Sequence, residues 1–187
     1  LLDISESTRD KVVRSKASVL DLEISASVLL AHAMSHLGDP FAIAAFCSNN
    51  RDDVRYYRIK DFNQLYNESV QSSLAGLESG LSTRIGAAIR HSGNNLIAQQ
   101  TYRKLLLIIT DGEPSDLDVD DTSYLIEDAR KAVQSLAHQG IDVFGVGLQT
   151  NGKSYLEKIF GRRNSIEINR VDLLPKKLPM LYLRMTA

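Results

Sequence analysis

The sequence is poor in features that cross-link a chain or anchor it in a membrane. Cys47 is the only cysteine among 187 residues, so no internal disulfide can form. There is no tryptophan, and no apolar run approaches the roughly 20 residues that a membrane helix needs. A net charge of −1 gives no support for nucleic acid or a membrane surface as partner. We therefore expect a cytoplasmic protein, because free thiols persist in that compartment.

The sequence also lacks the motifs of common enzyme classes. It has no Gly-x-Ser-x-Gly turn, no P-loop and no Gly-x-Gly-x-x-Gly, and no nucleophile with a paired base is evident. A magnesium phosphotransferase of the Asp-x-Asp type would need an acid where Ser5 stands. These absences disfavour the alternative of a metal-dependent hydrolase and predict a binding module without catalytic activity.

Apolar segments with strand and helix periodicity alternate along the chain, and hydrophobic residues make up 43% of it. Strands are expected near residues 1–2, 41–47, 54–59, 105–109, 141–148 and 165–168, and helices near 19–37, 64–78, 84–99, 124–138, 154–160 and 173–185. This alternation predicts an α/β fold: a doubly wound, mostly parallel six-stranded sheet with helices on both faces. The tyrosine-bearing segment 54–59 fits one short antiparallel edge strand. We expect residues 1–187 to form one domain and to be the C-terminal part of a longer protein, because the chain begins inside a strand.

Hard oxygen donors follow two of the predicted strands. Asp3, Ser5 and Ser7 come after the first strand, and Asp111 follows the aliphatic strand 105–109. Ligands of doubly wound sheets bind at the carboxyl ends of strands, where the strand order reverses. Carboxylate and hydroxyl oxygens suit Mg²⁺, Mn²⁺ or Ca²⁺ and do not suit zinc or copper. The pattern predicts a divalent-cation site.

The pattern Asp-x-Ser-x-Ser, with Thr83 and Asp111 downstream, resembles the metal-ion-dependent adhesion site (MIDAS) of von Willebrand factor A (VWA) domains. The resemblance covers nearly the whole chain and implies the strand order 3-2-1-4-5-6. It implies that Ser5 and Ser7 bind the ion directly, that Thr83 does so when a partner is engaged, and that Asp3 and Asp111 act through water. Its direct ligands are then largely neutral, so the ion keeps positive charge for an acidic residue of a partner.

Other polar residues admit simpler interpretations. Glu113 and Asp116 either shape partner choice at the rim of the site or are ordinary loop residues. His32 and His36 are four apart on a helix but lack a third soft ligand, which favours packing or a surface role. The acidic cluster at 118–121 lacks the glycine and distal glutamate of an EF-hand, so a solvated helix start is expected.

Further stretches resemble one group of A domains. They are 3–8, 38–43, 46–48, 53–56, 60–62, 81–91, 109–116, 159–161 and 178–184. Together they resemble the C-terminal A domain of the bacterial NorD/CbbO group, adaptors of MoxR-type AAA+ ATPases. The resemblance implies that the ATPase performs the work and that this domain recognises the client. The tetrapeptides Ser-Glu-Ser-Thr and Glu-Pro-Ser-Asp resemble the CbbO branch more closely, and the client of that branch is inhibited rubisco. The alternatives are the NorD branch, linked to nitric oxide reductase maturation, and an adhesion-type ligand-binding domain.

Overall fold

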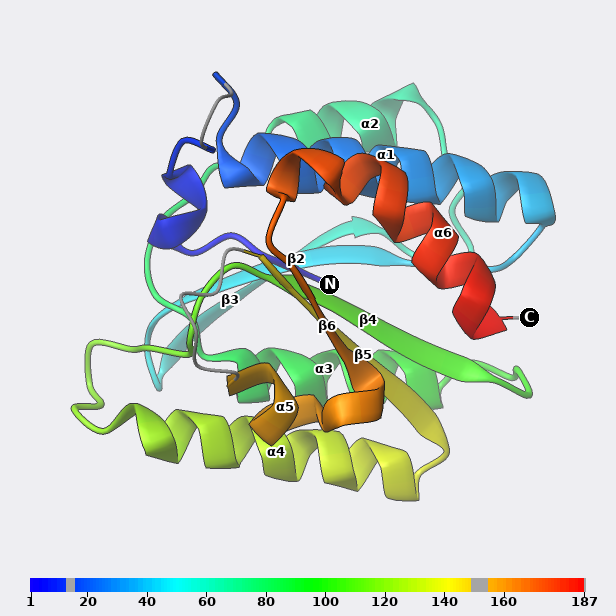
Figure 1. Cartoon of the computed structure of the whole chain (residues 1–187). Helices are drawn as coiled ribbons and strands as arrows, with labels where there is room; N and C mark the ends of the chain where they lie inside the picture. The colour runs from blue at the N-terminus through cyan, green and yellow to red at the C-terminus, as the bar shows by residue number, and fades with distance from the viewer. Residues whose placement is uncertain (13–15, 149–154, 187) are drawn as a thin grey trace.

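A six-stranded sheet forms the middle layer of the computed structural model, which describes residues 1–12, 16–148 and 155–186 (Figure 1). The strands are β1 (Leu2–Asp3), β2 (Ile43–Asn50), β3 (Asp53–Lys60), β4 (Lys104–Thr110), β5 (Ile141–Leu148) and β6 (Ser165–Ile168). Their order is β3-β2-β1-β4-β5-β6, with β3 antiparallel and the others parallel. The predicted fold class and strand order are confirmed. The antiparallel edge strand β3 is eight residues long, as long as β2.

Helices cover both faces of the sheet (Figure 1). One layer contains α1 (Val19–Leu37), α2 (Glu68–Ala75) and α6 (Leu174–Thr186). The other contains α3 (Ile85–Ile97), α4 (Thr122–His138) and α5 (Tyr155–Phe160). The structure also contains the short 3₁₀ helices η1 (Glu6–Arg9), η2 (Arg162–Asn164) and η3 (Val171–Leu173). Within the described residues no helix is both long and apolar enough to cross a membrane.

Several element boundaries differ from the sequence prediction, and for two of them the structure shows a local reason. Helix α2 begins at Glu68, four residues later than expected, because the Asn67 side chain caps it by accepting from the Val70 N–H at 3.1 Å. Strand β2 begins at Ile43, where its pairing with β3 starts. Phe41 lies before the strand, and its carbonyl accepts a bond from the buried Lys60 ammonium at 2.6 Å.

Strand β4 separates two hydrophobic cores because its side chains alternate between the faces of the sheet. Leu106 and Ile108 pack with the layer of α3, α4 and α5. Leu107 and Ile109 pack with the layer of α1, α2 and α6. This two-sided burial explains why the segment reads as an unbroken aliphatic run.

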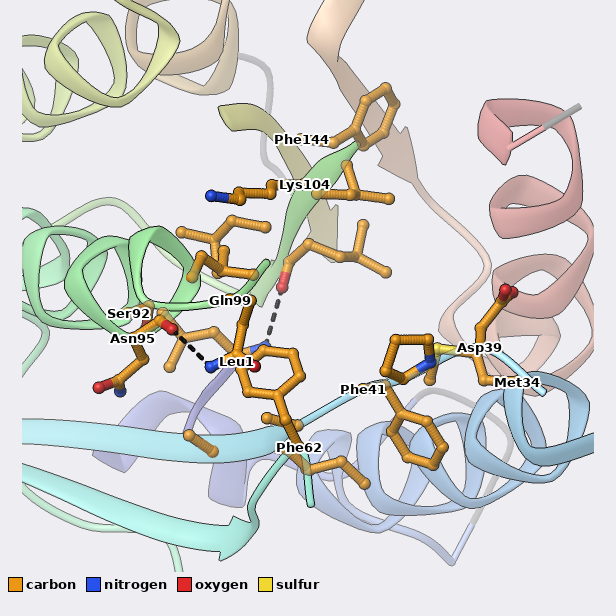
Figure 2. A pocket seen from close by; sticks show the side chains of 18 of the residues that line it. Leu1, Met34, Asp39, Phe41, Phe62, Ser92, Asn95, Gln99, Lys104 and Phe144 are labelled. Carbon is orange, nitrogen blue, oxygen red and sulfur yellow. Dashed lines mark hydrogen bonds between the residues drawn. The ribbon is translucent and has the colours of Figure 1, made fainter. Parts of the chain in front are cut away.

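A cavity of about 1040 Å³ lies at the amino ends of the parallel strands (Figure 2). Its lining includes Leu1, Phe41 and Lys104, with further residues of both β2 and β4. Leu1 pairs there with β4: its amine donates to the Leu107 carbonyl at 2.8 Å, and its carbonyl accepts from Ile109 at 3.0 Å. The cavity is therefore at the end of the sheet opposite to the side chains that follow β1 and β4.

Two glycines let α5 lie directly on β5. A Cβ on Gly145 would sit 2.3 Å from the Phe160 ring, and one on Gly147 would sit 2.2 Å from Leu156. Both contacting side chains are buried, so neither can swing into solvent. Glycine is needed here for close approach of a helix to a strand.

Gly145→Ala should therefore lower the free energy of unfolding by about 1–3 kcal/mol, because the added methyl overpacks the contact with Phe160. Urea unfolding followed by circular dichroism measures the change. Gly76→Ala is the matched control, because its Cβ would meet an ordinary contact of 3.4 Å at the exposed end of α2. Equal stability of the two variants would contradict this account of the β5–α5 packing.

Candidate metal site

The five residues predicted to form the site are brought together by the fold. Asp3 ends β1, Ser5 and Ser7 lie in the following turn, Thr83 precedes α3, and Asp111 follows β4. Hydrogen bonds connect them in series. Thr83 Oγ1 donates to Asp3 Oδ1 at 3.3 Å, and the Ser5 N–H donates to the same oxygen at 3.0 Å. Ser5 and Ser7 hydroxyls are 3.2 Å apart, and Ser7 Oγ donates to Asp111 Oδ1 at 2.8 Å.

Asp3 is the centre of this arrangement. Its side chain is fully buried, and its second oxygen accepts from Thr110 Oγ1 at 2.7 Å. Thr110 was not identified from the sequence, although it directly precedes Asp111 at the end of the aliphatic strand. Because Thr110 ends β4 and Asp3 ends β1, this bond fixes the two strand ends against each other.

The donor set fits a hard divalent cation. It contains two carboxylates and three hydroxyls, all oxygen ligands of the kind that Mg²⁺, Mn²⁺ and Ca²⁺ take. No group of three or more His, Cys, Asp or Glu side chains in the described parts of the chain could hold a metal.

The two carboxylates carry an electrostatic cost. Burial, followed by the negative charge of Asp3, raises the pKa of Asp111 to about 7 against the lowering effect of the Ser7 hydrogen bond. Burial also raises the pKa of Asp3, while bonds from Ser5, Thr110 and Thr83 oppose the shift. A cation bound between the carboxylates would offset both burial and repulsion.

Backbone pairing holds the loop that carries Thr83. Ser48, near the end of β2, exchanges two backbone bonds with Ser82, at 2.8 and 2.7 Å. The Thr83 N–H donates to the Ser115 carbonyl at 2.8 Å, which joins this loop to the loop after β4. Leu81 has φ of 66°, the only positive value at a non-glycine residue in the described chain. That backbone strain lies within the site loop and is maintained by its surroundings.

A buried ion pair reinforces the same junction. Arg84 Nε donates to Asp116 Oδ2 at 2.8 Å, and the Asp116 side chain is 0% exposed. Ser48 Oγ donates to the same oxygen at 2.8 Å. Arg84 also pairs with Asp118. Asp116 thus acts as a structural clamp that holds the Thr83 loop through Arg84. The sequence feature that could have indicated a buried acidic partner is Arg84, the residue directly after Thr83.

The remaining polar residues of interest have separate roles. Glu113 is exposed on the loop after Asp111. Asp121 caps α4 by accepting from the Ser123 N–H at 2.9 Å, as expected for a helix start. Asp118 is not simply solvated, because it pairs with Arg84. His32 is exposed and packs edge-on against Tyr66 with ring centroids 5.1 Å apart, within the packing or surface role expected for it. Cys47 is buried in β2.

Comparisons with known proteins agree with this architecture. A family model described as "von Willebrand factor type A domain" matches residues 1–173. Protein NorD of Brucella melitensis is 37% identical to this chain over 187 residues. That alignment covers 100% of this chain and 29% of the relative, so the chain spans less than a third of that protein's length.

Solved structures with low identity share the fold. The PilB minor pilin of Streptococcus sanguinis superposes with a TM-score of 0.77 at 15% identity, over 98% of this chain and 59% of the pilin. Proximal thread matrix protein 1 of the mussel byssus, solved with a zinc-occupied MIDAS motif, gives a TM-score of 0.67 at 16% identity. That match covers 96% of this chain and 45% of the byssus protein.

The raised pKa values predict how the metal-free protein responds to pH. The folded state holds a proton on Asp111 up to about pH 7, whereas the unfolded chain releases it near 3.8. The stability from this group is fully present below about pH 4 and is lost as pH rises to about 7. Urea unfolding in chelator should therefore show decreasing stability across that window.

Asp111→Asn should flatten this pH dependence and raise the stability of the metal-free protein at pH 7. Asp52→Asn, at a 90% exposed carboxylate in the β2–β3 turn, is the control and should leave the slope unchanged. An identical slope in the protein with and without Asp111→Asn would show that this carboxyl is not perturbed.

Asp116→Asn should lower the free energy of unfolding by about 1–3 kcal/mol, because the buried Arg84 guanidinium then keeps only one charged partner, Asp118, whose side chain is 30% exposed. Limited proteolysis should also cut faster within 79–84. Asp172→Asn breaks an exposed pair with Arg170, at 71% and 43% exposure, and should cost at most about 1 kcal/mol. Similar losses in the two variants would refute the clamp.

Proposed function

This chain belongs to the von Willebrand factor type A domain family, and on that premise we propose that it is a metal-dependent protein-binding module. The observation that carries the proposal is the convergence of Asp3, Ser5, Ser7, Thr83 and Asp111 at one end of the sheet. The byssus protein with a zinc-occupied MIDAS has the same fold, which supports a divalent ion in this position.

The hydroxyl and carboxylate residues of the candidate site have different roles in the proposed binding. A divalent cation, when bound, supplies a Lewis-acidic position that an anionic oxygen of a partner can occupy. Ser5, Ser7 and Thr83 provide neutral oxygens, which leave much of the ion's charge uncompensated. Asp3 orients Ser5 and Thr83 through its hydrogen bonds, and Asp111 orients Ser7. The partner group that fits best is therefore the carboxylate of an acidic residue.

We further propose that the module recognises the client of an adaptor that works with a MoxR-type AAA+ ATPase. The similarity to NorD over the whole chain supports membership of the NorD/CbbO group. Between its branches, this similarity favours a NorD-type role in nitric oxide reductase maturation. The tetrapeptides Ser-Glu-Ser-Thr and Glu-Pro-Ser-Asp favoured inhibited rubisco as the client, and that client stays a prediction. In either case the domain itself is not an enzyme, and the ATPase supplies the activity.

Client capture should require the metal ligands. Ser7→Ala removes an exposed hydroxyl and Thr83→Val removes a buried one, so each deletes a proposed ligand with little change in shape. Losing such a charge-assisted contact typically costs about 2–5 kcal/mol, so affinity for the client should fall more than tenfold. Pull-downs of purified nitric oxide reductase and of inhibited rubisco, each with Mg²⁺ and with EDTA, measure the effect.

The control is Ser73→Ala, whose exposed hydroxyl bonds only to the Ser69 carbonyl of α2. Calorimetric titration of the same proteins with Mg²⁺, Mn²⁺ and Zn²⁺ tests the metal site separately. Capture that persists in EDTA and in both ligand variants would refute the metal bridge. Capture of rubisco but not of nitric oxide reductase would favour the CbbO branch over the NorD branch.

A further inference from the structure

Leu117 is an exposed apolar residue in the loop that follows β4 and Asp111. Its side chain is 77% exposed, although leucine is usually buried. It occupies a tight turn with Asp118, because Asp116 pairs with Val119 across the turn and its carbonyl accepts from the Val119 N–H at 3.3 Å. A single exposed leucine is common on protein surfaces. This one differs from the others in how its turn is held and in where the turn lies.

Side chains on both sides of Leu117 fix the turn. The Leu117 N–H donates to Asp116 Oδ1 at 2.8 Å, and Asp116 Oδ2 accepts from Arg84 Nε at 2.8 Å. Asp118 also pairs with Arg84, and it accepts from the Arg51 N–H at 3.1 Å. The leucine is therefore held on an ordered turn, so little conformational entropy is lost when a partner covers it.

The same contacts place Leu117 close to the candidate metal site. Thr83 exchanges two backbone bonds with Ser115, and Arg84 directly follows Thr83 in the sequence. The Cα atoms of such a pair lie about 5.5 Å apart, and the next two residues add at most about 7.6 Å. Leu117 therefore lies within roughly 13 Å of Thr83. About four residues of an extended partner segment span that distance.

The charges beside the turn are compatible with an acidic partner. Asp116 and Asp118 flank Leu117, and both are paired with Arg84. Their side chains are 0% and 30% exposed, so neither presents a free carboxylate on the surface. A segment that binds the ion through an acidic side chain can then lie along the turn without strong repulsion between like charges.

We propose that Leu117 is a second contact point of the binding surface, and that the partner segment carries an apolar side chain within about four residues of the acid that binds the ion. This inference rests on the proposed metal-dependent binding function and adds which kind of segment the site selects. The acid contacts the ion, and the apolar side chain covers Leu117. Because both contact points are held in place, only a segment with the matching spacing makes both contacts.

Peptide selection tests the composition of this segment directly. Random heptapeptides displayed on phage are selected on the immobilised chain in Mg²⁺, with a parallel selection in EDTA. Peptides enriched only in Mg²⁺ should contain Asp or Glu and, at a constant spacing from it, Leu, Ile, Met or Phe. The same selection on Leu117→Ser should retain the acid and lose the apolar preference.

The affinity of the most enriched peptide, made synthetically, measures the size of the effect. Leu117→Ser should weaken its binding about tenfold, as expected for the loss of one buried leucine side chain. Leu117→Met should weaken it less than about threefold, because Met is apolar and of similar volume. Leu65→Ser is the matched control and should leave the affinity unchanged: Leu65 is 84% exposed, and it follows the end of β3 that pairs with the start of β2.

The three variants should keep the Mg²⁺ affinity and the melting temperature of the unsubstituted chain, because both leucines are exposed. Selected peptides with an acid but no apolar preference, or equal peptide affinity in Leu117→Ser, would overturn this inference and leave the metal site standing. Peptides that bind equally in EDTA, or a selection that enriches no acid in Mg²⁺, would overturn the proposed metal-dependent function and this inference together.

Discussion

The buried carboxylate of Asp3 is the interaction on which the rest of the candidate site depends. It accepts bonds from Ser5, Thr83 and Thr110, which belong to three separate segments. Without it the Ser5 N–H and the Thr83 hydroxyl would lose this acceptor in a poorly solvated region, and buried unsatisfied donors are costly. One carboxylate therefore fixes the turn after β1, the loop before α3 and the end of β4 relative to one another.

The sheet topology explains why this carboxylate can do so. Strand β1 lies between β2 and β4, where the order of the sheet reverses and the connecting segments leave toward opposite faces. The chain segments that follow β1 and β4 therefore diverge, toward α1 on one face and α4 on the other (Figure 1). The Arg84–Asp116 pair and the bonds of Ser48 join the loops beside these strand ends. The candidate site thus lies at the carboxyl ends of the strands, away from the cavity at their amino ends (Figure 2).

Electrostatics makes the candidate site unfavourable without a compensating charge. Burial raises the pKa of both Asp3 and Asp111, and the charge of Asp3 raises that of Asp111 as well. The folded core is formed by aliphatic side chains on both faces of β4. The stability of the core is what allows an unfavourable group of acids to persist, since functional sites commonly retain such costs.

The sequence by itself determined the element order and the fold class, because hydrophobic periodicity is a local property. The five oxygen donors were predicted from the spacing of Asp3, Ser5 and Ser7 and from the family resemblance, and they stay a prediction. It could not determine the roles of Thr110, Arg84 or Asp116. Nothing near these residues in the sequence shows which distant group they face. Asp116 reads as an ordinary loop acid. Only the pairing of the loop before α3 with the loop after β4 made it the buried partner of Arg84, because the sheet, and not the local sequence, brings these two loops together.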